Sequence, residues 1–132
     1  VEPYLVASSI TGIIAQRLVR RICDNCKEDY EASEYESKVI LGVVKEGLKL
    51  YRGKGCGHCN NTGYMGRVGV YEIMEITKEH RELITKKKGT EAIRELSKEK
   101  GMTTLEEECK KLVLSGTTSI SELASIALLK YI

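Results

Sequence analysis

The strongest constraint on this fold comes from two CxxC pairs. Cys23 and Cys26 form the first pair, Cys56 and Cys59 form the second, and 29 residues lie between the pairs. A CxxC turn places two sulfur atoms on one edge of a zinc tetrahedron, so two such turns complete a four-thiolate site. Because that site leaves no coordination position open for water, we predict a structural Zn²⁺ and no metal-based hydrolysis.

Disulfides, a redox-active CxxC and chance spacing are the alternative explanations of the pairs. A redox CxxC is expected near a single βαβ unit, whereas this chain has two pairs. A structural zinc contributes about 10–16 kcal/mol of apparent binding free energy. An insert of about forty residues needs such a contribution, because it is too small to bury a core of its own.

Three further side chains are of types that can bind metals or take part in catalysis. His58 lies inside the second pair and is an alternative ligand, but we expect it to face solvent. Cys109 is expected to be a buried thiol, since its helical spacing matches that of Leu105, Leu112 and Val113. His80 has no visible partner, and no role is predicted for it.

Two segments have the pattern of β-strands. Apolar and polar residues alternate over Gly12–Ile22, and Arg67–Ile76 is rich in Val, Ile and Tyr. We predict that they form an antiparallel pair in which the segment from Cys23 to about Met65 replaces the usual hairpin turn. A short helix over Tyr4–Ser9 is expected to precede the first strand.

The remaining segments have helical signals. Ser33 and Glu36 have capping-box spacing, which predicts one helix between the cysteine pairs, ending at Gly47. From Thr77 onward we predict four short helices, separated by Gly89, Gly101 and Gly116. Capping-box spacing recurs in this tail, at Thr103 with Glu106 and at Ser119 with Glu122.

These patterns predict an α+β fold with three parts. Residues 1–22 and 66–76 would carry the strands, residues 23–65 would form the zinc-binding insert, and residues 77–132 would form a helical subdomain.

Charge argues against a nucleic-acid-binding zinc module. Residues 22–65 contain six Lys or Arg and seven Asp or Glu. A tetrathiolate zinc site adds about two more negative charges, and a surface that follows a phosphate backbone needs the opposite sign. We therefore expect no nucleic-acid partner, although the basic clusters Arg17–Arg21 and Lys86–Lys88 keep that alternative open.

Hydropathy and the N-terminal residues suggest a cytoplasmic location and a longer parent protein. The longest apolar run, Ile126–Leu129, is far shorter than the roughly 18–20 residues that cross a bilayer, and no signal-peptide pattern is present. The sequence begins at Val1 without an initiator Met, so we expect a fragment.

Two longer runs carry a resemblance to a known family. LVASSITGIIAQRLVRRICDNC and YRGKGCGHCNNTGYMGRVGVYEIMEI closely resemble the C-terminal part of the type II secretion and type IV pilus assembly ATPases, in the branch with a tetracysteine insert. The combination of AQRLVR, two CxxC pairs, GYxGR and the following YE is more specific than any single motif. One departure is Asp24, where the family frequently has proline; this change leaves the ligand set intact.

The resemblance implies the C-terminal part of a RecA-like ATPase domain. Such ATPases use ATP and Mg²⁺, assemble as hexameric rings at the cytoplasmic face of the inner membrane, and act with the membrane platform proteins of the secretion or pilus machine. This sequence contains no GxxxxGK[ST] loop, so we expect no catalytic residue here and no ATP hydrolysis by the fragment alone.

The resemblance also implies a nucleotide contact. Arg67 matches the family arginine that lies near the adenine of the bound nucleotide, and a guanidinium can stack on an aromatic base. The alternative is a strand arginine paired with Glu72 or Glu75. Gln16 and Arg17 match the QRL motif, for which we predict only a position on the strand.

A second hypothesis of a different class is a free-standing structural zinc adaptor that binds protein or nucleic acid. The sequence upstream of Val1 would distinguish this adaptor from the ATPase, since the ATPase requires a phosphate-binding loop there. The resemblance covers both secretion and pilus assembly and favours neither.

Overall fold

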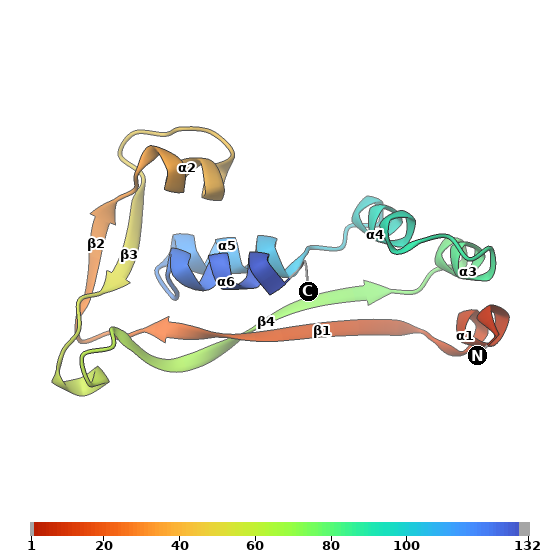
Figure 1. Cartoon of the computed structure of the whole chain (residues 1–132), viewed down its shortest axis with the longest axis horizontal. Coiled ribbons are helices and arrows are strands. Elements are labelled where there is room, and N and C mark those ends of the chain that lie inside the picture. The colour runs from red at the N-terminus through yellow and green to blue at the C-terminus, as the bar shows by residue number, and fades with distance from the viewer. Residues whose placement is uncertain (1, 130–132) are drawn as a thin grey trace. The chain divides into compact units, whose positions relative to one another are not determined.

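The computed structural model describes residues 2–129, whose elements divide between two compact units (Figure 1). Unit 1 contains the residues up to Gln16 together with Tyr71–Thr104, and unit 2 contains Arg17–Val70 together with the residues from Leu105 onward. Each unit has its own buried residues. The three-part division expected from the sequence stays a prediction.

An antiparallel strand pair connects the elements before and after the cysteines. Strands β1 (Gly12–Ile22) and β4 (Tyr64–Glu75) pair with each other, and their arrows run in opposite directions in Figure 1. Backbone hydrogen bonds extend the pair at both ends, from Ile76 N–H to Thr11 O (3.1 Å) and from Cys23 N–H to Gly63 O (2.9 Å). The predicted α+β class and the interrupted strand pair are confirmed.

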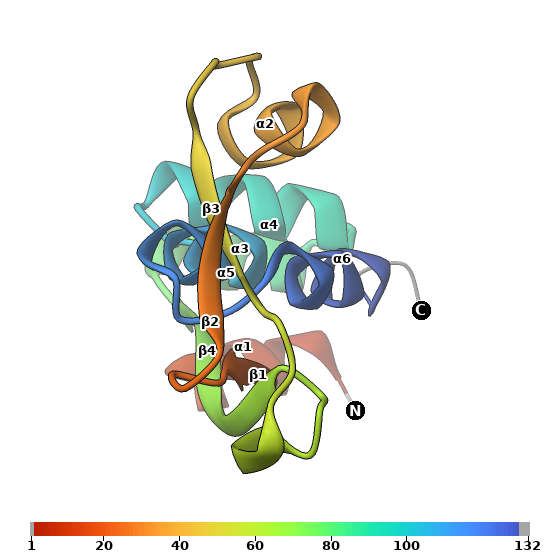
Figure 2. The ribbon, with the colours of Figure 1, turned by 90° about the vertical axis from the view of Figure 1, so that its left-hand side faces the viewer.

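The insert contains a β-hairpin that the sequence analysis did not predict. Strand β2 (Lys27–Glu31) pairs antiparallel with β3 (Lys49–Gly53), and helix α2 (Glu34–Leu41) connects them at the far end of the hairpin (Figure 2). The hairpin was missed because its first strand, KEDYE, has almost no apolar residue and therefore lacks the usual strand pattern. Cross-strand charges favour the pairing instead: Glu28 lies opposite Arg52 and accepts from its Nε at 2.9 Å.

Helix α2 begins as predicted and ends early. Ser33 and Glu36 form the capping box, with each side chain accepting from the other residue's backbone N–H. The predicted end at Gly47 is wrong, because Gly42 already adopts the left-handed conformation that terminates the helix, at φ 78°. Val43 and Val44, which lie before Gly47, are exposed loop residues and not part of the helix.

The tail forms the predicted series of short helices. Helices α3 (Lys78–Thr85) and α4 (Thr90–Glu99) belong to unit 1, and α5 (Leu105–Ser115) and α6 (Ile120–Leu129) belong to unit 2. The last residues of the predicted helical subdomain, 130–132, lie outside the described part of the chain. Within residues 2–129, none of these helices is long and apolar enough to cross a membrane.

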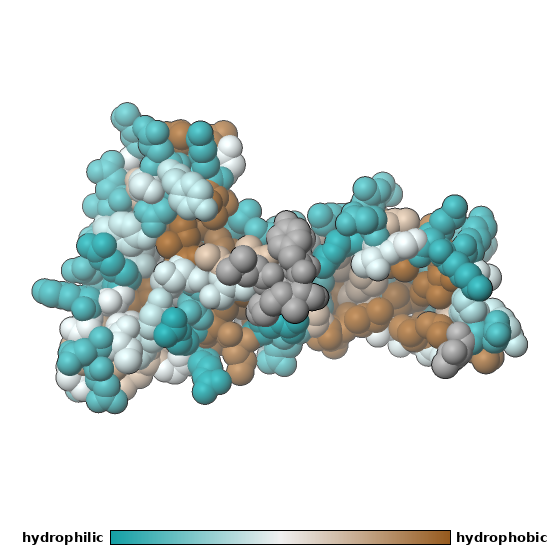
Figure 3. All heavy atoms as spheres, in the orientation of Figure 1, coloured by the Kyte–Doolittle hydropathy of each residue, from teal (hydrophilic) through white to brown (hydrophobic). Residues whose placement is uncertain are grey.

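The core of unit 2 joins the insert to the tail helices. Its buried members come from β1, α2, β3, β4, α5 and α6, and are Val19, Ile40, Leu50, Val70, Cys109, Val113, Leu123 and Ile126. Figure 3 shows apolar side chains gathered below α2, on the side that faces α5. Cys109 is fully buried here, as predicted, and burial raises the pKa of its thiol to about 11.

Unit 1 contains helix α1 (Pro3–Ser9), which packs against α3 and is fixed by a 3.0 Å hydrogen bond from Arg81 Nε to Ala7 O.

Helix α3 also carries His80, the side chain for which no role was predicted. His80 is fully buried, accepts from Thr77 N–H at Nδ1 (3.1 Å), and contacts Ser97 Oγ through Nε2 at 2.8 Å. The Thr77-x-x-His80 spacing, typical of an N-cap, was the available signal.

Candidate metal centre

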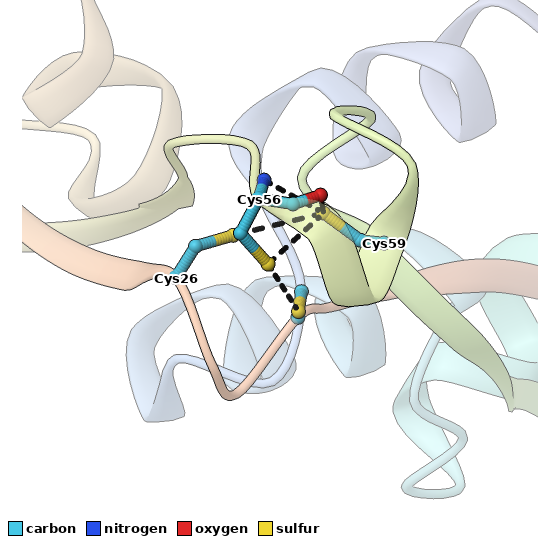
Figure 4. Close-up of side chains that lie close together, drawn as sticks. Cys26, Cys56 and Cys59 are labelled. Carbon is cyan, nitrogen blue, oxygen red and sulfur yellow. Dashed lines mark hydrogen bonds between the residues drawn. The ribbon is translucent and has the colours of Figure 1, made fainter.

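The four cysteines of the CxxC pairs meet at the base of the hairpin. Cys23 and Cys26 lie in the turn between β1 and β2. Cys56 precedes the short 3₁₀ helix η1 (Gly57–Cys59), and Cys59 is its last residue. Figure 4 shows the sulfur atoms of Cys26, Cys56 and Cys59 pointing toward one another. All four sulfur atoms lie within 4.8 Å of one another.

The sulfur spacing fits a tetrahedral metal ion. Sγ–Sγ distances are 3.8 Å for Cys23–Cys56, 3.8 Å for Cys26–Cys59 and 3.6 Å for Cys56–Cys59. A tetrahedron with the zinc–sulfur distance of about 2.3 Å has edges of about 3.8 Å. The cysteines are free thiols rather than disulfides, so this group of donors could hold one ion.

Close backbone approach determines where glycine is required around the site. A Cβ on Gly53 would lie 2.0 Å from Gly63 O, so two chain segments touch with no room for a side chain. Gly55 adopts φ +100°, a backbone conformation that favours glycine in a tight loop. A Cβ on Gly57, by contrast, would meet nothing within 4 Å.

Backbone amides point at two of the sulfur atoms. Cys59 Sγ accepts from the N–H groups of Cys56 (3.3 Å) and Gly63 (3.2 Å), and Cys26 Sγ accepts from Gly55 N–H (3.3 Å). Desolvation alone would raise the pKa of Cys59, but these donors and the neighbouring thiols outweigh it and lower the pKa to about 6. The loop therefore favours the thiolate that a metal ion requires.

The other thiols respond to their own surroundings. A hydrogen bond from the Asn25 side chain is the largest influence on Cys56 and lowers its pKa, whereas desolvation raises the pKa of Cys26 to about 11.

Soft thiolate donors select zinc over the hard cations Mg²⁺ and Ca²⁺. Four of them fill a tetrahedral shell, so the arrangement suits a structural ion. His58 is exposed and does not belong to the cluster.

Arg67 lies on β4, eight residues after Cys59 in sequence, and is exposed. Together with Arg20, Thr62, Tyr64 and Gly66 it lines an open hollow of about 380 Å³. The Glu72 carboxylate, suggested as its alternative partner, accepts from Arg94 at 3.4 Å.

The QRL residues occupy β1 as predicted. Gln16 donates from Nε2 to the Tyr71 hydroxyl at 3.3 Å, across the strand pair, and Arg17 is exposed on the same strand.

The sequence analysis missed an ion pair three residues from the first cysteine of the cluster, between Arg20 and Glu122. Glu122 accepts from Arg20 Nη2 at 2.8 Å and from Arg20 Nε at 3.0 Å, and the Arg20 guanidinium stacks over the Tyr64 ring, 4.0 Å from its centroid. Glu122 had been expected to cap its own helix with Ser119. No local pattern could reveal a partner 102 residues away.

Comparison with known proteins gives one family. The sequence model of the family described as "Type II/IV secretion system protein" matches residues 1–125. The type II secretion system ATPase E of Vibrio cholerae is 44% identical over 93 residues, which cover 70% of this chain and 18% of that protein. The type IV pilus assembly ATPase PilB of Thermus thermophilus is 36% identical over 125 residues, or 92% of this chain and 14% of the relative.

A third relative, the type II secretion system protein E of Pseudomonas aeruginosa, is 35% identical over 127 residues, which cover 96% of this chain and 25% of that protein. The chain thus spans at most about a quarter of the length of these three relatives.

Proposed function

The chain belongs to the type II/IV secretion system protein family, and from that premise we propose that it is the zinc-bearing C-terminal region of an ATPase that powers type II secretion or type IV pilus assembly. The observation that carries the proposal is the coincidence of a family match over residues 1–125 with four sulfur atoms at tetrahedral spacing. The relatives named as ATPases belong to both secretion and pilus systems.

The direct test of the ATPase proposal uses the whole protein that contains this chain. We expect a GxxxxGK[ST] phosphate-binding loop upstream of Val1 and Mg²⁺-dependent ATP hydrolysis by the purified protein. A reading frame without such a loop, together with no hydrolysis, contradicts the proposal and favours the adaptor hypothesis.

The metal of the proposed site is Zn²⁺, held by Cys23, Cys26, Cys56 and Cys59. When bound, the ion links the turn that follows β1 to the loop that precedes β4. The chain supplies the thiolates, the N–H donors that stabilise them, and the glycine contact between Gly53 and Gly63 that lets the two loops approach. With no open coordination position, the ion stabilises the insert and takes no part in hydrolysis.

Metal analysis and one pair of variants test this assignment. We expect about one Zn²⁺ per chain in protein purified without chelator, and loss of the zinc together with local unfolding of the insert in Cys56→Ser. His58→Ala is the matched control, because His58 lies in the same CxxC turn and is exposed. Wild-type protein without zinc, or loss of zinc in His58→Ala but not in Cys56→Ser, refutes the four-cysteine site.

We also propose that Arg67 contacts the base of the bound nucleotide. Its exposure and its position on the rim of the hollow leave the guanidinium accessible to a ligand. Arg20 in the same hollow is engaged by Glu122 and Tyr64, which leaves Arg67 as the arginine better suited to a new partner.

Nucleotide titration of the whole protein tests Arg67. We expect Arg67→Ala to weaken ATP binding about tenfold, in line with the about 0.5–2 kcal/mol of a cation–π contact. Lys45→Ala removes one positive charge from an exposed loop of the same unit and is the charge-matched control. Equal affinities in the two variants would remove the proposed role.

In the assembled state, we propose a hexameric ring at the cytoplasmic face of the inner membrane, in contact with the platform proteins of the machine. This part rests on the family membership alone. Native mass spectrometry of the whole protein with ATP should give a six-subunit mass, and a monomer under all nucleotide conditions would contradict the ring.

A further inference from the structure

One short segment of unit 2 contacts the chain on both sides of the metal centre. This latch segment, Gly116–Glu122, joins α5 to α6 and includes the first turn of α6. Its Thr117 carbonyl accepts from Ile22 N–H at 2.9 Å, and its Thr118 hydroxyl donates to Arg20 O at 2.7 Å. Both backbone partners lie within three residues of Cys23 in sequence.

The latch segment also contacts the residues that follow the second cysteine pair in sequence. The hydroxyl groups of Ser119 and Tyr64 are hydrogen-bonded to each other, and Tyr64 is the first residue of β4. Tyr64 follows Gly63, whose N–H donates to Cys59 Sγ and whose carbonyl accepts from Cys23 N–H. The latch therefore touches both strands at the point where they lead into the metal centre.

Glu122 gives the latch its charged contact. Its carboxylate accepts from the backbone N–H of Arg20 at 2.9 Å and from the Arg20 side chain at 2.8 and 3.0 Å. The Glu122 side chain is only 11% exposed. A carboxylate that is mostly removed from water needs such partners, so displacement of β1 would leave an unpaired charge at the latch.

Gly116 brings the latch against the hairpin between the cysteine pairs. A Cβ at this position would lie 2.9 Å from Lys27 Nζ and 3.1 Å from the Tyr51 ring, and the backbone is left-handed at φ +82°. Lys27 begins β2, directly after Cys26, so the latch reaches a third segment that leaves the metal centre.

We propose that docking of the latch segment and zinc binding by the four cysteines are thermodynamically coupled. The inference rests on the proposed zinc site and adds a regulatory property to it. Zinc holds the Cys23 turn and the Cys59 loop in place, which preorganises the backbone groups of Arg20 and Ile22 and the Tyr64 hydroxyl for the latch. By linkage, the docked latch strengthens zinc retention by the same factor as zinc strengthens docking.

Zinc release from the whole chain into excess chelator measures one direction of the coupling. Thr118→Val removes the hydroxyl that donates to Arg20 O at nearly constant volume, and Glu122→Gln removes the charge that pairs with Arg20. We expect both variants to bind about one Zn²⁺ and to release it at least about fivefold faster than wild type. Ser125→Ala is the control, because the Ser125 hydroxyl is exposed and donates within α6, to Ser121 O at 3.3 Å.

Hydrogen exchange of the wild-type chain measures the other direction and needs no variant to fold. Removing zinc should speed exchange at the Ile22 amide, which donates to Thr117 O, and at the amides of the first turn of α6. Exchange in α4, which belongs to unit 1, serves as the internal reference.

The outcomes separate this coupling from the zinc assignment. A wild-type chain that contains no zinc defeats the zinc site itself. If the wild-type chain contains zinc but Thr118→Val and Glu122→Gln release it at the same rate as Ser125→Ala, the coupling is wrong and the zinc site stands. Unchanged exchange at Ile22 after zinc removal overturns it as well.

Discussion

Acidification should destabilise unit 1 through His80. The imidazole accepts from Thr77 N–H, which requires an unprotonated Nδ1, so Nε2 carries the proton and donates to Ser97 Oγ. Ser97 in turn donates to Ile93 O at 2.9 Å. This chain of hydrogen bonds joins the start of α3 to α4. A proton added at Nδ1 would face the Thr77 N–H and break that hydrogen bond, which leaves the Thr77 hydroxyl, 2.8 Å from Nδ1, as the remaining acceptor.

The direction of the effect follows from the pKa of His80. Desolvation in the buried site lowers the pKa of the imidazole, Glu79 opposes this decrease, and Lys100 adds to it. Because the folded-state pKa is lowered, the unfolded chain binds more protons than the folded chain at pH values below the ordinary histidine pKa of about 6.5. The contribution of His80 to the free energy of unfolding should therefore be fully present above about pH 6.5. It should decrease as the pH falls toward the folded-state pKa and level off below that pKa.

The largest slope that one histidine can contribute is about 1.4 kcal/mol per pH unit. Urea unfolding at pH values from about 7.5 to about 5.5 would measure it, and a His80→Leu/Ser97→Ala double variant is the reference. That variant replaces both polar partners with apolar groups, so it should unfold with little pH dependence in this window.

NMR titration gives the residue-specific measurement. The chain contains two histidines, so a His58→Gln background leaves His80 as the single imidazole signal. A His80 imidazole that titrates at or above about 6.5, or equal pH slopes in wild type and the double variant, would refute the reasoning.

The remaining predictions concern the insert and its core. Gly53→Ala should unfold the metal loops and weaken zinc retention, because its Cβ would clash with Gly63 O, whereas Gly57→Ala, in open space, should retain zinc like wild type. Leu50→Ala, at a fully buried position, should lower the free energy of unfolding by about 2–5 kcal/mol, and Leu114→Ala, at a 40% exposed position, by much less. Ser33→Ala should cost about 1 kcal/mol in urea unfolding, because it removes the N-cap of α2; an unchanged unfolding midpoint would contradict the role of the capping box.

Local patterns in the sequence predicted a large part of this structure. The bounds of β1, the capping box at Ser33 and the glycine-separated tail helices all follow from interactions within a few residues. The four cysteines were also identified correctly as a cluster, since CxxC spacing already places each pair of sulfur atoms on one edge of a tetrahedron.

The features that were missed depend on contacts between distant segments. Strand β2 exists because β3 pairs with it, and its own residues favour no strand. Gly53 owes its importance to Gly63, whereas a Cβ at Gly57 would meet nothing within 4 Å, although both resemble ordinary loop glycines. Glu122 has the local spacing of a capping residue, yet its carboxylate binds Arg20.

Residue chemistry and short-range spacing therefore account for the cysteine cluster, the α+β class and most element boundaries, because these depend on neighbours along the chain. The tertiary structure alone reveals the His80 hydrogen-bond chain and the latch segment around the cysteine centre, because both require side chains and backbone groups from separate elements to meet. The spacing of the four cysteines is a generic zinc pattern, and only the fold shows which distant residues are hydrogen-bonded to the strands that lead into the cysteine cluster.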